Sequence, residues 1–159
     1  MMKALTIWQP WCSLIIVGAK PYEFRSWEAP RSVVGQRIAL HAGARKVKRE
    51  EIANLILRLK GDNRWTTGLR PEIALPFLEK WHAHPGSLPL SCILGTALLG
   101  APRRAGHIAH EFGGAFINDS ERDEYANFAW PMLDLRVSND LRPVKGAQGF
   151  FNCDYSEAA

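Results

Sequence analysis

Residues 18–27 read Gly-Ala-Lys-Pro-Tyr-Glu-Phe-Arg-Ser-Trp, and this stretch indicates the secondary structure of the residues around it. Gly18 can end a preceding helix, because glycine tolerates the left-handed conformation that follows many helix C-termini. The residues after it look extended, and successive side chains of a strand point to opposite faces. Glu23, Arg25 and Trp27 therefore share one face. The stretch predicts a helix that leads directly into a strand with a charged and aromatic face.

The charged side chains of this stretch are the first candidates for ligand binding. Lys20 can supply a point charge for a phosphate, and Arg25 a planar fork for a phosphate or a base edge. Glu23 can orient one of these cations or accept a hydrogen bond from a base amino group. An ion-pair cluster that only stabilises the strand surface is the alternative, and spacing alone leaves both open.

Two tryptophans flank an amide side chain shortly before this stretch, where residues 8–11 read Trp-Gln-Pro-Trp. Trp11 falls on the apolar stripe of the predicted helix and is expected in the core. Trp8 and Gln9 are the better ligand candidates. An indole stacks on any base, and an amide can both donate to and accept from a base edge.

Hydrophobic periodicity predicts an α+β fold, with flanking helices around a small β-barrel of five or six strands. Strands are expected at residues 4–8, 22–27, 37–42, 91–99, 128–137 and 150–155, and helices at residues 10–17, 48–60 and 76–84. Pro131 suggests an edge strand or a bulge, because proline cannot donate to a strand ladder. Residues 1–159 are expected to form one domain with a helical insertion around residues 46–90.

Composition narrows the class of protein. The chain has 159 residues, 47% of them hydrophobic, which fits one core. Its formal charge of +4 mildly favours polyanionic partners. An odd number of cysteines and the lack of any long apolar run predict a cytoplasmic protein that is neither secreted nor bound to a membrane. His107 and His110 are three apart, but no zinc-ligand spacing accompanies them, so neither a metal nor a cofactor is expected.

Four segments together resemble an ASCH domain, a family with a PUA-like fold. They are residues 5–11 (Leu-Thr-Ile-Trp-Gln-Pro-Trp), residues 18–27 (Gly-x-Lys-x-x-Glu-x-Arg-x-Trp), residues 37–42 (Arg-Ile-Ala-Leu-His-Ala) and residues 143–151 (Pro-Val-Lys-Gly-Ala-Gln-Gly-Phe-Phe). The resemblance implies a β-barrel with helices beside it, relatives that commonly bind RNA, and a cleft near the Gly-x-Lys-x-x-Glu pattern. It also places His41, Lys145 and Gln148 at this cleft.

The sequence therefore predicts a domain that binds RNA or a nucleotide or nucleoside in a charged and aromatic cleft. The alternative is a small hydrolase acting on modified cytidine or on single-stranded RNA, an amidohydrolase or a ribonuclease, with Lys20 and Glu23 as its catalytic residues. Related amidohydrolases use a Lys, a Thr three residues later and a Glu on a later strand. Here position 23 is Glu, and residues 93–99 contain no carboxylate. A protein-interaction domain is a third possibility, and the oligomeric state is not predicted.

Overall fold

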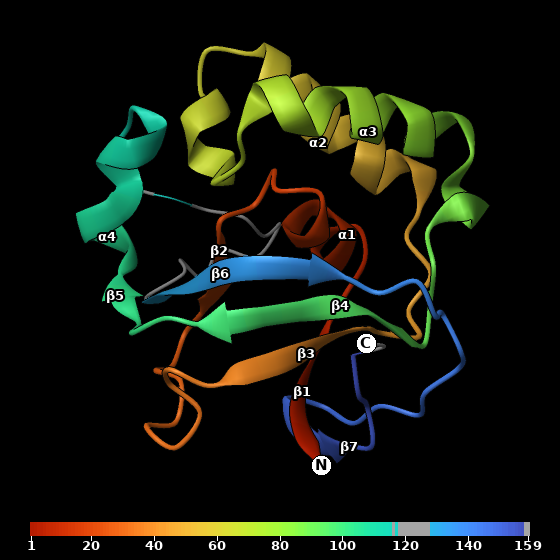
Figure 1. Cartoon of the computed structure of the whole chain (residues 1–159). Coiled ribbons are helices and arrows are strands. Elements are labelled where there is room, and N and C mark those ends of the chain that lie inside the picture. Colours follow the sequence, from red (N-terminus) through yellow and green to blue (C-terminus); the bar gives the residue numbers. More distant parts are fainter. Residues whose placement is uncertain (116, 118–127, 158–159) are drawn as a thin grey trace.

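A computed structural model describes residues 1–115, 117 and 128–157 as a strongly curled mixed sheet with helices packed beside it (Figure 1). The described strands are β1 (Met2–Ile7), β2 (Tyr22–Arg25), β3 (Arg37–Ala42), β4 (Cys92–Leu99), β5 (Arg103–Arg104), β6 (Phe128–Val137) and β7 (Phe150–Cys153). Their order is β2-β6-β4-β3-β1-β7, and β5 pairs with β6. Only the β1–β3 pair is parallel among the described strand pairs. The predicted α+β fold is confirmed, and the unpredicted two-residue β5 makes seven strands.

The described helices fall into two groups. They are α1 (Trp11–Ile16), α2 (Arg49–Lys60), α3 (Pro71–Ala83) and α4 (Ala105–Ile108), with 3₁₀ turns η1 (Arg64–Thr67), η2 (Pro85–Ser87) and η3 (Ala109–Phe112). The pair α2 and α3 lies along one side of the sheet, and α1 lies between that pair and the strands (Figure 1). None of the described helices is long and apolar enough to cross a membrane.

Helix α3 begins five residues earlier than predicted. The prediction took Pro76 as the first residue of the helix, because proline suits that position. In the structure Pro71 occupies the first turn and Pro76 lies inside the helix. A proline there removes one helical hydrogen bond. The burial of Leu78 and Trp81 against α2 and α1 offsets this cost.

Pro131 lies on β6, which is an inner strand and not an edge. It sits where β6 changes partners: β6 pairs with β2 up to Pro131, and its pairing with β4 begins at Met132. The Pro131 carbonyl accepts a hydrogen bond from the backbone N–H of Gly100 at 2.9 Å. A residue without an N–H fits this position because the hydrogen-bonded partner of β6 changes there from β2 to β4.

Aromatic side chains show how tightly the sheet curls. Trp130 on β6 is fully buried, and its ring stacks on Phe150 of β7 with 5.9 Å between centroids and 4° between planes. Several strands separate β6 from β7 in the sheet order, so this contact requires the sheet to wrap around its core. The indole N–H of Trp130 also donates to the carbonyl oxygen of Trp27 at 3.2 Å. This closure brings the end of β2 close to β1 and β7.

Candidate functional site

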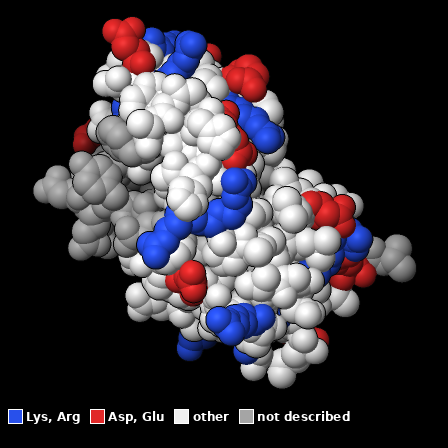
Figure 2. Space-filling view, turned by 90° about the vertical axis from the view of Figure 1, so that its left-hand side faces the viewer, with Lys and Arg blue, Asp and Glu red and all other residues white. Residues whose placement is uncertain are grey.

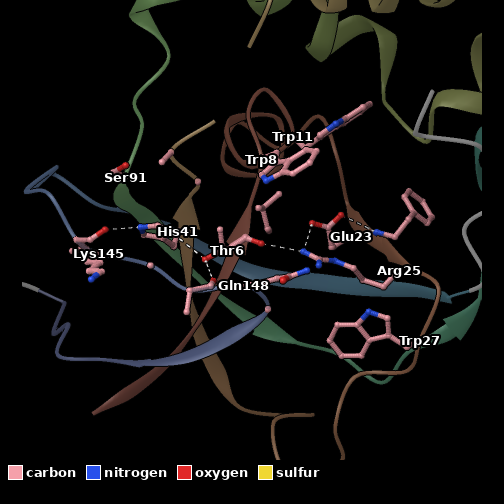
Figure 3. Close-up of a pocket in the computed structure, with 18 of the residues that line it drawn as sticks. Thr6, Trp8, Trp11, Glu23, Arg25, Trp27, His41, Ser91, Lys145 and Gln148 are labelled. Carbon is pink, nitrogen blue, oxygen red and sulfur yellow. Dashed lines mark hydrogen bonds and ion pairs between the residues drawn. The ribbon is translucent and has the colours of Figure 1, made fainter. Parts of the chain in front are cut away.

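A cavity of about 850 Å³ is lined by residues from the first part of the chain and from residues 144–149. Four segments supply most of its wall: the end of β1 and the turn after it, β2 and the residues that follow, the end of β3, and residues 144–149, here called the closing segment. Segments from both ends of the sequence therefore meet at one site (Figure 3). The volume falls within the range of small-molecule sites in proteins.

Two exposed indoles face each other across this cavity. Trp8 and Trp27 keep 49% and 41% of their surface exposed, and both line the cavity. In Figure 3, Trp8 and Trp11 lie on one side, Trp27 lies on the other, and the side chains of Glu23 and Arg25 lie between them. Exposed tryptophan is uncommon because its large ring favours burial. The arrangement leaves two aromatic faces available to a flat ligand.

Both indoles are fixed by their neighbours. The guanidinium of Arg45 lies 4.8 Å from the ring centroid of Trp8, a cation–π contact. Trp27 packs edge-on against Trp130 with 4.8 Å between centroids. The sequence analysis did not find Arg45, since nothing in its local pattern points to Trp8.

The central charge of the cavity wall is the carboxylate of Glu23, which is only 4% exposed. Its oxygens lie 4.0 Å from Lys20 Nζ and 3.6 Å from Arg25 Nη2, and one accepts the backbone N–H of Phe24 at 3.0 Å. Arg25 Nη2 also donates to the carbonyl oxygen of Thr6 at 3.1 Å. Two cations and an amide therefore stabilise a nearly buried anion. Glu23, Arg25 and Trp27 all line the cavity, but β2 ends at Arg25, so Trp27 follows the strand instead of sharing its face.

Lys20 lies behind the cavity wall rather than in it. The side chain is completely buried, with Nζ 5.0 Å from the ring centroid of Trp11 and 4.4 Å from that of Phe24. Lys20 is not among the described residues that line the cavity. After Gly18 the chain folds back on the helix end, and the amide of Lys20 donates to the carbonyl of Leu14 at 3.0 Å. This turn directs Lys20 inward, so its position differs from the direct phosphate contact that the sequence suggested.

Gln9 is also buried, at 1% exposure. Its amide nitrogen donates to Ser13 Oγ at 2.7 Å and to the carbonyl oxygen of Pro89 at 2.9 Å. Its carbonyl oxygen accepts the backbone N–H of Ser13 at 3.0 Å. Both amide hydrogens and the oxygen are thus used within the protein, at the start of α1. This differs from the predicted contact with a base edge.

The closing segment is attached to His41 and Thr6. His41 is 2% exposed, with Nε2 2.8 Å from the carbonyl oxygen of Val144 and Nδ1 3.2 Å from Thr6 Oγ1. The Thr6 hydroxyl donates to the carbonyl oxygen of Ala147 at 2.7 Å. Gly146 lies against the imidazole, where an added Cβ would stand 2.3 Å from Cε1. Gly146 therefore packs closely against His41.

Lys145 and Gln148, the remaining predicted site residues, are exposed and line the cavity. Figure 3 places Lys145 at the His41 end of the site. Thr6 is a site residue that the sequence analysis missed, although strand alternation puts it on the same face as Trp8.

The charged side chains on the described surface are mixed in sign. On the face in Figure 2, Lys and Arg side chains are interspersed with Asp and Glu. The cationic side chains available to a ligand in the cavity are therefore those that line it, Arg25 and Lys145. Within residues 1–115, 117 and 128–157, no three His, Cys, Asp or Glu side chains are grouped so as to hold a metal ion.

Comparison with known proteins gives a similarity in fold. Neither the protein-family models nor the curated proteins yield a match. Among solved structures, the crystal structure of ASCH from Zymomonas mobilis matches with a TM-score of 0.40 and 16% sequence identity. The match covers 84% of this chain and 66% of that chain, so the present chain spans just under two thirds of its length.

Proposed function

We propose that this protein binds an unpaired nucleobase and its adjacent phosphate, presented by single-stranded RNA or by a free nucleotide. The observation that carries the proposal is the pair of exposed indoles, Trp8 and Trp27, on opposite sides of the cavity with Glu23 and Arg25 between them. Single-stranded nucleic acids are commonly bound by aromatic rings that stack on bases beside cations that contact the backbone.

The polar groups of the cavity suit the two parts of such a ligand. Arg25 and Lys145 are cationic side chains on its wall, and their donors suit phosphate oxygens. Glu23 is the one acidic side chain among the described lining residues and can accept N–H groups from a base edge. We assign Lys20 an indirect part, because its buried ammonium lies 4.0 Å from the Glu23 carboxylate and helps to hold it at the wall. Gln9 then contributes by fixing the start of α1.

The test is calorimetric titration with short single-stranded RNA and with the four common nucleoside monophosphates, at low and moderate salt. Trp8→Ala and Trp27→Ala should each weaken binding by about 10- to 100-fold, since one base–aromatic stack contributes about 1–3 kcal/mol. Lys145→Ala should weaken binding and also reduce its dependence on salt. Lys80→Ala is the matched control, because this exposed lysine lies on α3 outside the cavity.

Two results would contradict the proposal. One is unchanged affinity in both tryptophan variants, which would remove the stacking that defines the site. The other is wild-type protein that binds neither RNA nor any monophosphate at low salt.

The hydrolase alternative is supported by a single feature, a nearly buried carboxylate at the cavity wall. Glu23 has the position that a general base would need, whereas Lys20 lies behind the wall. Incubation with acylated cytidine and with single-stranded RNA, followed by product analysis, separates the alternatives. Product that is lost in Glu23→Gln would favour the hydrolase, and binding without product would favour the proposed binding function.

The cytoplasm is the compartment that we propose. Cys12, Cys92 and Cys153 are all free and buried. Free thiols suit a reducing compartment, where disulfides rarely persist. Location of a tagged full-length protein by microscopy and fractionation tests this assignment, and recovery outside the cytoplasm would contradict it.

A further inference from the structure

The three hydrogen-bond contacts around His41 determine how many protons its imidazole ring must carry. The carbonyl oxygen of Val144 can only accept, so Nε2 of His41 must carry a proton. The carbonyl oxygen of Ala147 can also only accept, so the hydroxyl hydrogen of Thr6 points to it. Thr6 Oγ1 then has only lone pairs to offer to Nδ1, 3.2 Å away. All three contacts are hydrogen bonds at the same time only when Nδ1 is protonated too, which makes the ring a cation.

A neutral ring satisfies only two of these contacts. With the proton on Nε2, the Thr6 hydroxyl must choose between Nδ1 of His41 and the carbonyl oxygen of Ala147. Donation to Nδ1 gives up the attachment of the closing segment to Thr6, and donation to Ala147 gives up the bond between Thr6 and His41 that joins β1 to β3. A proton on His41 therefore tightens the wall of the cavity.

Within the described part of the chain, no carboxylate forms an ion pair with the ring, and Glu23, the carboxylate of the cavity wall, is paired with Lys20 and Arg25. His41 packs edge-on against Phe151 of β7, pairs with Ile93 of β4 and contacts Thr6 of β1. The titratable or charged side chains around this region are Cys153 on β7 with Asp154 beside it, Lys145 on the closing segment, and the pair of Glu23 and Arg25, of which Arg25 reaches β1 from β2. Burial raises the pKa of the Cys153 thiol and keeps it neutral. The charge of Arg25 is balanced by Glu23, which leaves Lys145, at the His41 end of the site, to meet an anion (Figure 3).

We infer that His41 is a positioning residue whose doubly protonated ring clamps the closing segment, and that an anionic ligand in the cavity is bound together with a proton on His41. The inference rests on the proposed function for the identity of the ligand, a phosphate-bearing nucleic acid. A phosphate beside Lys145, which lies at the His41 end of the site (Figure 3), adds negative charge near the ring. His41 itself does not contact the ligand, and it acts through Val144, Thr6 and Ala147.

The test measures proton uptake on binding. Short single-stranded RNA without a terminal phosphate is titrated in buffers of different ionisation enthalpy, because a phosphomonoester itself titrates near pH 6. A net fraction of a proton should be taken up between about pH 6 and 8, and affinity should fall as pH rises, by at most about tenfold per pH unit. His41→Gln and Thr6→Val should each abolish the uptake. His84→Gln, at an exposed histidine outside the cavity, should leave it unchanged.

A second measurement uses the free protein and needs no ligand. Nitrogen NMR of the imidazole should find the neutral ring protonated at Nε2. Exchange of the Val144 amide, which donates to the Ser91 carbonyl at 2.7 Å, should slow as His41 becomes protonated, after correction for intrinsic rates. RNA binding without proton uptake overturns the coupling, and an Nδ1-protonated neutral ring or unchanged exchange overturns the clamp. Complete absence of RNA binding would contradict the proposed function, and the NMR result would still decide the clamp.

Discussion

Arg25 on β2 donates through Nη2 to the carbonyl oxygen of Thr6 on β1, at 3.1 Å. The two strands lie near opposite ends of the sheet order, so this bond joins strands that share no ladder in the described sheet. The same guanidinium lies 3.6 Å from Glu23. One side chain thus helps to close the curled sheet and also balances the charge at the cavity wall.

Replacement of Arg25 by alanine should lower the free energy of unfolding. The change leaves Thr6 without this donor and removes one of the two cations beside the nearly buried Glu23, at a cost of about 1–3 kcal/mol. Arg25→Lys should cost less, since it keeps the charge but loses the fork geometry. Urea denaturation monitored by tryptophan fluorescence measures both. Arg31→Ala, in an exposed turn, is the control, and equal stability of Arg25→Ala and this control would refute the dual role.

Glu51 links the start of α2 to the aromatic wall. Its carboxylate accepts hydrogen bonds from the Arg45 side chain and from the backbone N–H of Lys48, and Arg45 lies over Trp8. Burial alone would raise the pKa of Glu51, but these hydrogen bonds and the nearby positive charge outweigh it and hold the pKa below the ordinary value of 4.5. Glu51→Gln should therefore reduce stability by about 1 kcal/mol at neutral pH.

The pH dependence of that difference has a definite sign. Because the pKa of Glu51 is lower in the folded than in the unfolded protein, its contribution is complete above about pH 4.5 and declines as pH falls through the folded-state pKa. Urea melts of wild type and Glu51→Gln should converge at acid pH. A constant difference down to about pH 3 would mean that the carboxylate charge is not what stabilises this contact.

The closing segment should tolerate no side chain at Gly146. An added Cβ would stand 2.3 Å from Cε1 of His41, so Gly146→Ala must displace the segment or the ring. We expect a loss of about 1–3 kcal/mol in stability, and weaker RNA binding in the calorimetric assay. Gly106→Ala is the matched control, because its Cβ meets no atom within 4 Å. Stability and binding equal to those of the control would show that the packing at His41 is not tight.

The cysteine thiols should be unreactive in the native protein. Burial raises the pKa of Cys12 well above its ordinary value, with Glu23 adding to the shift, and burial also raises the pKa values of Cys92 and Cys153. The reactive thiolate is therefore scarce at neutral pH, and access is blocked as well. Labelling with a disulfide reagent should be at least about tenfold slower than in urea, where all three cysteines should react. Fast labelling of one native thiol would show that its site opens.

The sequence predicted the regular elements well because their signals are local. Alternation placed Glu23 and Arg25 on one strand face, and helical spacing found α2 almost to the residue. The site was predicted less well. Lys20 and Gln9 were expected to meet a ligand, but their positions depend on contacts such as that between Gln9 and Pro89, which lies 80 residues away. The single domain with an insertion at residues 46–90 stays a prediction.

The cavity wall combines Trp8 and Trp27, from the start of the chain, with the closing segment, which precedes β7. During synthesis the two indoles emerge early, whereas their partners at residues 144–149 emerge after nearly everything else. The cavity wall is therefore incomplete until β7 pairs with β1 and brings the closing segment into place. The site is therefore complete only once β1, β2 and the closing segment have come together.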